Sequence, residues 1–162
     1  IPLIQGGMGI GVSLGNLAGH VMREGGMGVI SAAQPGYLEH DFKTNTIEAN
    51  IRALEKEILK AREISNGKGL LGVNLMVAAE HYDVYAKAIS QMDIDVIISG
   101  AGLPLELPTL SVNPDVLLAP IVSSSKAMVL LIKRWISRAN RYPDLIIIEG
   151  PLAGGQIGRA HV

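Results

Sequence analysis

The stretch Asp95-Val96-Ile97-Ile98-Ser99-Gly100-Ala101-Gly102 joins a short aliphatic run to a glycine-rich turn. Such a run is typical of a strand that is buried on both faces, as in the centre of a parallel sheet. Residues 144–149 repeat the order of an acidic residue, an aliphatic run and a polar end. The chain therefore predicts parallel strands that end in polar or glycine-rich turns.

Outward from this stretch, aliphatic runs alternate with amphipathic segments along the chain. The pattern predicts six strands, at residues 2–5, 28–31, 70–75, 96–98, 117–122 and 145–148. Helical periodicity predicts helices over residues 14–24, 46–64, 82–91 and 126–139. This βα order fits either a doubly wound open sheet or a (β/α)8 barrel. A complete barrel needs about 250 residues, so six units would make about three quarters of one.

The composition excludes several classes of protein. With a net charge of -1 the chain lacks the basic surface of a nucleic-acid-binding protein, and without cysteine it has no disulfide, thiolate metal site or cysteine nucleophile. No apolar run reaches the roughly 18 residues of a membrane-spanning helix, and the first residues do not resemble a secretory signal. We therefore expect a cytoplasmic protein that binds neither nucleic acid nor membrane. We also expect that it has no metal site.

Ligands of both architectures bind at the carboxyl ends of the strands, so the turns there hold the candidate site residues. Met8 lies in the turn Gly6-Gly7-Met8-Gly9-Ile10-Gly11, which is either a tight structural turn or a loop that faces a ligand. Asn74 at the end of a strand is either a loop cap or a hydrogen-bonding partner of a polar ring edge. The run Ser123-Ser124-Ser125-Lys126 suits either an anion or a plain helix cap.

The most informative turn is Glu149-Gly150-Pro151-Leu152-Ala153-Gly154-Gly155-Gln156. A carboxylate directly after a buried strand, followed by three glycines, indicates a loop whose backbone lies against a ligand. The histidines His20, His40 and His81 fall on predicted helix or loop surfaces, where we expect them to be solvated rather than catalytic.

Six blocks follow one another in the chain: Gln5-Gly6-Gly7-Met8-Gly9, Gly26-Met27-Gly28-Val29-Ile30-Ser31, Gly72-Val73-Asn74-Leu75-Met76, Gly100-Ala101-Gly102-Leu103-Pro104, Ala119-Pro120-Ile121-Val122-Ser123 and the Glu149–Gly155 segment. In this order they resemble the nitronate monooxygenase family, formerly called 2-nitropropane dioxygenase, which includes FMN-dependent enoyl-acyl-carrier-protein reductases. The resemblance implies a TIM barrel, here incomplete with about six βα units, that binds FMN noncovalently. By the family pattern, the cofactor-binding residues would be Met8, Gly9, Asn74, Lys126, Glu149, Ala153, Gly154 and Gly155.

The implied reaction is the oxidation of an alkyl nitronate by O2 to a carbonyl compound and nitrite. The alternatives are an FMN-dependent enoyl-thioester reductase and, in another class, a non-catalytic flavin- or ligand-binding domain. The family uses a histidine of a Gly-Gly-His-x-Gly motif as the catalytic base, and Gln156 stands at that position. Glutamine cannot accept a proton in this way.

The ends of the chain suggest a piece of a larger protein. It begins at Ile1 within a predicted strand, and residues 157–162 match one reading frame of a widely used sequencing adapter. We interpret residues 1–156 as a partial FMN-binding TIM-barrel domain and residues 157–162 as a non-native tail. On this interpretation the natural gene continues with His at position 156, and the fragment itself is inactive.

Overall fold

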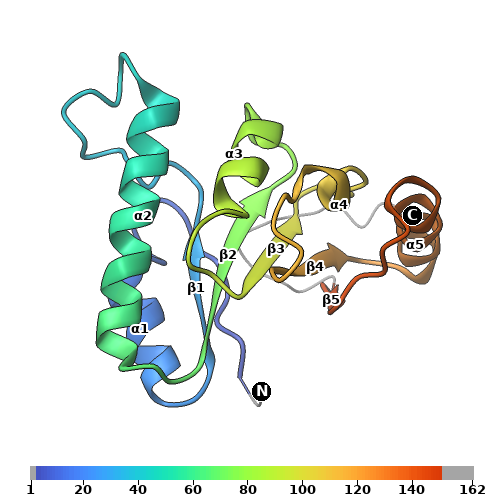
Figure 1. The fold of residues 1–162 in the computed structure, drawn as a ribbon, viewed down its shortest axis with the longest axis horizontal. Helices are drawn as coiled ribbons and strands as arrows, with labels where there is room; N and C mark the ends of the chain where they lie inside the picture. Colours follow the sequence, from blue (N-terminus) through green and yellow to red (C-terminus); the bar gives the residue numbers. More distant parts are fainter. Residues whose placement is uncertain (1–2, 151–162) are drawn as a thin grey trace.

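The computed structural model describes residues 3–150 as a parallel sheet covered by helices (Figure 1). The elements, in order, are α1 (Gly15–Arg23), β1 (Met27–Ser31), α2 (Thr46–Ser65), β2 (Leu70–Met76), α3 (Tyr82–Ile89), β3 (Val96–Gly100), α4 (Leu107–Leu110), β4 (Leu117–Val122), α5 (Ser125–Ala139) and β5 (Ile147–Ile148). All neighbouring strands are parallel, and their spatial order is that of the sequence. A doubly wound sheet reverses its order at a switch point, so the fold is a partial TIM barrel, as predicted.

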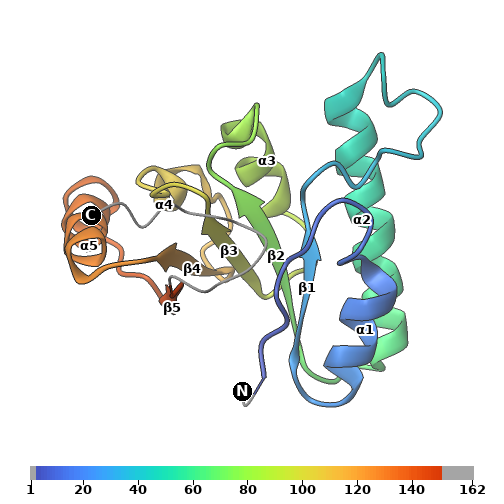
Figure 2. The ribbon, with the colours of Figure 1, turned by 180° about the vertical axis from the view of Figure 1, so that it is seen from behind.

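The two faces of the curved sheet pack differently (Figure 2). The outer face and the helices share one hydrophobic cluster, in which Ile30, Val73 and Ile97 meet residues such as Leu54 and Trp135. The inner face has a smaller cluster made only of strand residues: Met27, Val29, Val96, Ile98 and Ala119. The helices therefore cover one side of the sheet and leave the inner side free, as in the wall of a barrel.

The predicted first strand is reduced to a single parallel bridge between Ile4 and Met27. Beyond the bridge, the Gln5 side chain replaces the backbone as the partner of β1. Its amide nitrogen donates to the Val29 carbonyl at 3.0 Å, and its carbonyl oxygen accepts the Val29 N–H at 3.2 Å. A side-chain amide has the same donor and acceptor as a peptide group, so the chain turns away from the sheet without leaving Val29 unpaired.

Other elements differ from the prediction at their ends. The last strand, β5, contains two residues instead of the predicted four, and Ile148 is 78% exposed because no further strand among the described residues covers it. The short helix α4 was not predicted, since four residues are too few to show a helical period. The αL residues Asn66 and Asn140 end α2 and α5.

Helix α1 lies in very close contact with its neighbours because it and β1 contain glycine at the contact points. A Cβ on Gly15 would lie 2.2 Å from the Glu57 carbonyl oxygen of α2, and one on Gly28 would lie 2.1 Å from that of Ala18. The Glu57 carboxylate also accepts the N–H of Gly15 at 2.7 Å, capping a helix that has no local side-chain cap. Of the helices that the structure describes, none combines the length and apolarity needed to cross a bilayer.

Two aspartates hold the amino ends of the strands in register. Asp95, just before β3, accepts the N–H of Leu71 at 2.7 Å, and Asp144, before β5, accepts that of Leu118 at 2.8 Å. Each carboxylate is also paired with an arginine, Asp95 with Arg62 and Asp144 with Arg141. The acidic residues that open both aliphatic runs thus fix the edge of the sheet opposite to the turns.

Candidate active site

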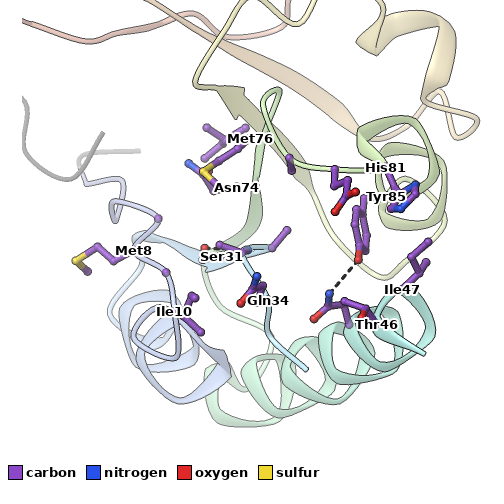
Figure 3. A pocket seen from close by; sticks show the side chains of 18 of the residues that line it. Met8, Ile10, Ser31, Gln34, Thr46, Ile47, Asn74, Met76, His81 and Tyr85 are labelled. Carbon is purple, nitrogen blue, oxygen red and sulfur yellow. Dashed lines mark hydrogen bonds between the residues drawn. The ribbon is translucent and has the colours of Figure 1, made fainter. Parts of the chain in front are cut away.

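A cavity of about 1250 Å³ opens at the carboxyl ends of the strands, on the inner face of the sheet. Its floor is apolar and consists of strand residues, Ile98, Ile121 and Ile147. One wall is the turn after the first bridge, and the other is formed by the segments that lead into α2 and α3 (Figure 3). The volume exceeds the roughly 300–1,000 Å³ that is usual for small-molecule sites.

Four of the predicted site residues line this cavity: Met8, Gly9, Asn74 and Glu149. Lys126 does not line it and is exposed in the first turn of α5. The predicted residues Ala153, Gly154, Gly155 and Gln156 lie outside the described residues. The structure thus brings together the candidates from three separate strand ends.

Glycines in the first turn let this loop pack tightly on the strand ends. A Cβ on Gly7 would lie 2.5 Å from Cβ of Asn74, and one on Gly9 would lie 2.7 Å from Cβ of Ala33. Between them Met8 is 46% exposed and lines the cavity. These glycines therefore allow close packing against the protein, and the Met8 side chain between them is presented to the cavity.

The buried hydroxyl of Ser13 holds the same loop. It accepts hydrogen bonds from the Met8 N–H at 3.0 Å and from the Gln5 amide at 3.1 Å, and it donates to the Gly6 carbonyl at 3.2 Å. The Ser13 backbone also bonds both to Met8 and to Ser31 at the end of β1. The role of Ser13 could not be predicted from the sequence because it depends on a contact with β1.

Asn74 is one of the polar residues that line the cavity. It stands on the inner face of β2, in register with Ser31 of β1 and Ile98 of β3. The absence of a Cβ at Gly7 leaves room for the Asn74 side chain. Among the hydrogen bonds of the described residues, none involves its side-chain amide. The amide is thus available to a ligand, and the loop-cap interpretation finds no hydrogen bond to support it.

The second wall contains residues that the sequence analysis did not single out. Gln34, Thr46, Asn50 and Tyr85 all line the cavity there, beside the exposed His81. His81 is solvated, as expected, but it also lies at the cavity. A signal was available, because the helices that follow neighbouring parallel strands begin at the same edge of the sheet.

The serine run after β4 forms a helix cap. Ser124 is the N-cap residue of α5, and its hydroxyl accepts the N–H of Ala127 at 3.2 Å. Of the two interpretations that the sequence left open, the structure supports the cap.

The loop before α2 carries an ionic cluster. Lys56 bonds one carboxylate oxygen of Glu39 at 2.8 Å, and Arg52 bonds the other oxygen at 3.2 Å as well as the carboxylate of Asp41. The hydrogen bond from Lys56 and the charge of Arg52 hold the pKa of Glu39 below its ordinary value. His40 completes a group of three possible metal ligands, but cationic side chains already pair with both carboxylates.

The comparisons with known proteins agree with this geometry. No curated protein matches the chain. The structure of the M276A mutant of FabK from Thermotoga maritima superposes with a TM-score of 0.66 and 26% identity, over 94% of this chain and 45% of that chain. The structure of FabK from the same organism gives 0.60 and 23%, over 89% and 40%. This chain thus spans less than half the length of either FabK chain.

A match of the sequence to a family model is more specific than these structural similarities. The family model for nitronate monooxygenase matches residues 1–162, which includes every strand end at the cavity. The fold, the place of the cavity and this match agree, and the chain belongs to the nitronate monooxygenase family.

Proposed function

We propose that this chain is part of an FMN-dependent oxidoreductase that oxidises alkyl nitronates with O2 to a carbonyl compound and nitrite. The observation that carries the proposal is the amide of Asn74, which lies in a cavity at the strand ends and bonds to no described residue. Membership of the family supports the class of reaction.

The residues of the cavity fit a flavin. A flat ring with polar edges needs an apolar surface and a few fixed hydrogen-bonding groups. The isoleucines of the floor supply the apolar surface, and the Asn74 amide supplies a hydrogen-bonding group. We propose that Met8, Gly9, Asn74 and Glu149 hold the ring, with Ala153, Gly154 and Gly155 beside it. Lys126 does not line the cavity, and we propose that it contacts FMN away from the ring. When bound, FMN would supply the electron transfers between the substrate and O2.

The chain's own residues bind and orient the substrate. A nitronate has already lost the proton from the carbon that bears the nitro group, so its oxidation requires no base on the protein. A neutral nitroalkane still carries that proton, and its use requires a base. Gln156 cannot supply one, so we propose that the chain with glutamine at this position acts on the nitronate form.

The second candidate is an enoyl-thioester reductase. The size of the cavity favours it, because about 1250 Å³ leaves room for an acyl chain beside a flavin ring. A non-catalytic flavin-binding domain is the candidate of another class. We propose no metal and no nucleic-acid partner for any of the three.

One set of assays on the protein produced from its natural gene tests these functions. The nitronate function predicts a flavin absorbance spectrum and nitrite release from propane-2-nitronate in the presence of O2. An enoyl-thioester reductase would instead consume a nicotinamide cofactor with a crotonyl thioester. Flavin binding with neither activity would support the non-catalytic domain.

In the same protein, Asn74→Ala should raise the dissociation constant of FMN about tenfold, by removing a hydrogen bond to the ring. The matched control is Asn45→Ala, at the cavity wall away from the strand ends. Equal dissociation constants for the two variants would contradict the assignment of Asn74.

A further inference from the structure

Tyr85 lies at the cavity wall opposite Met8 (Figure 3). It belongs to α3 and is only 6% exposed. A tyrosine hydroxyl in such a place usually has a partner both for its oxygen and for its proton. In Tyr85 only the oxygen has a partner among the described residues.

Asn50 of α2 fixes the direction of the hydrogen bond to Tyr85. Its side-chain oxygen accepts the N–H of Gly36 at 2.9 Å in a buried position. A backbone N–H can only donate, so the oxygen of the amide must face Gly36 and the NH2 group must face Tyr85. The distance from this nitrogen to the Tyr85 oxygen is 2.9 Å. Tyr85 is therefore the acceptor in this bond.

With its oxygen bonded to Asn50, the hydroxyl of Tyr85 still has a proton that it can donate. No described group accepts a hydrogen bond from its hydroxyl, and the residue lines the cavity. A hydroxyl whose oxygen is held from one side by an amide donor directs its proton away from that donor, so a cavity ligand can receive it.

Tyr82, three residues earlier on the same helix, makes the opposite case. Its hydroxyl is 3.0 Å from the hydroxyl of Ser99, which itself donates to the Leu75 carbonyl at 2.9 Å. The proton of Tyr82 is thus used within the protein, and burial raises the pKa of this phenol to about 12. Tyr82 does not line the cavity. The hydroxyl proton of Tyr82 is therefore bonded within the protein, whereas that of Tyr85 is available to a ligand.

We propose that Tyr85 is a substrate-binding residue that donates its hydroxyl proton to an oxygen atom of the substrate, the nitro oxygen of a nitronate or the carbonyl oxygen of a thioester. Asn50 acts as a positioning residue that keeps this proton directed to the cavity. The inference rests on one part of the proposed function, namely that a substrate with a nitro or carbonyl oxygen binds in the cavity.

Binding, measured without turnover, tests this role. Without O2, the change in flavin absorbance gives the dissociation constant of propane-2-nitronate from the protein with reduced FMN and that of a crotonyl thioester from the protein with oxidised FMN, because neither probe can exchange electrons with that form of the flavin. Tyr85→Phe should raise the dissociation constant of the bound probe about tenfold, as expected for one lost hydrogen bond to an oxygen. Tyr82→Phe is the matched control and should leave it unchanged. Equal constants for the two variants would overturn the proposal.

A second variant keeps the hydroxyl and changes only its direction. In Asn50→Asp a carboxylate, which only accepts, would face both Gly36 and Tyr85. The proton of Tyr85 should then turn to the aspartate, and the probe should bind about as weakly as in Tyr85→Phe. With an uncharged crotonyl thioester as the probe, which the new carboxylate does not repel, a merely structural role of Tyr85 predicts wild-type binding for any folded Asn50→Asp protein, and that result would overturn the proposal.

Different results would refute the role of Tyr85 and the proposed oxidation of nitronates. Binding of a probe without nitrite release refutes nitronate oxidation, while the variants still test Tyr85 with that probe. Failure of both probes to bind the flavin-loaded wild-type protein overturns the role of Tyr85. Loss of FMN in Tyr85→Phe also overturns it, because the hydroxyl would then serve the cofactor.

Discussion

Ser13 is a fully buried serine with three hydrogen bonds to the loop that presents Met8 to the cavity. Ser13→Ala leaves the Met8 N–H and the Gln5 amide without this acceptor. We expect a loss of about 1–3 kcal/mol in the free energy of unfolding, together with weaker flavin binding, measured by thermal unfolding and flavin titration.

The control for Ser13 is Ser65→Ala. Ser65 is equally buried, but its hydroxyl donates to the Arg62 carbonyl at 2.9 Å within α2, away from the cavity. This variant should be less stable and should bind flavin as the wild type does. If both variants bind flavin with the wild-type affinity, Ser13 supports only the fold.

Residue 156 gives a second prediction at this scale. The protein produced from the natural gene, with glutamine at position 156, should release nitrite from a preformed nitronate and not from the neutral nitroalkane. Gln156→His should raise the rate with the nitroalkane about a hundredfold, the usual effect of a general base, and should leave the nitronate rate nearly unchanged. Gln156→Asn is the control, and the assay is nitrite release from each form. Equal use of both forms by the Gln156 protein would contradict this prediction.

Contacts between whole elements depend on the glycines of α1 and β1. Gly28→Ala places a Cβ against the backbone of α1, 2.1 Å from the Ala18 oxygen. Either the helix or the strand must shift, and we expect a loss of about 3 kcal/mol. Gly6→Ala is the control, because a Cβ there meets nothing within 4 Å. Similar stability of the two variants in denaturant unfolding would refute the close packing of α1.

The ion pairs between α2 and the preceding loop predict a pH dependence. The lowered pKa of Glu39 means that its carboxylate stabilises the folded state above its ordinary pKa of 4.5. This contribution should disappear as the pH falls through the lowered value. Thermal unfolding between about pH 6 and pH 3 should show a smaller acid loss in Glu39→Gln than in the wild type. Glu24→Gln, on an exposed pair with Arg23, is the control, and an unchanged acid profile in Glu39→Gln would contradict the prediction.

Most elements could be predicted from the sequence because their signals are local. Aliphatic runs gave the strands, and their polar ends gave Met8, Asn74 and Glu149 as neighbours at one cavity. Of the first strand, the described residues form one parallel bridge at Ile4, because beyond it the Gln5 side chain bonds β1 in place of the backbone. The second wall was missed because Asn50 and Tyr85 meet only after α2 and α3 have packed.

In the molecule as a whole, the larger hydrophobic cluster and the cavity lie on opposite faces of the sheet. The helices and the outer face of the sheet form one cluster, whereas the cavity opens from the inner face. Trp135, the single tryptophan of the chain, belongs to the outer cluster and is fully buried, with its indole N–H bonded to the Pro104 carbonyl at 2.9 Å.

The wavelength of the Trp135 emission should therefore report the unfolding of the outer cluster and not the occupancy of the cavity. In a denaturant titration of the flavin-loaded protein, we expect the tryptophan emission to move to longer wavelength only after the flavin has been released. The two signals are followed in one sample, and Asn74→Ala should lower the midpoint of flavin release alone. Coincident midpoints in the wild type and in Asn74→Ala would show that cavity and core unfold as one unit.

The carboxylates of Asp95 and Asp144 have a practical consequence for laboratory evolution. They fix the register of the sheet at the edge opposite to the cavity. Libraries that randomise Thr44, Thr46, Glu48 and Glu80, which are exposed and line the cavity, would leave both anchors intact, so many members should still fold. Selection on such libraries could search for new substrates without first having to restore the scaffold.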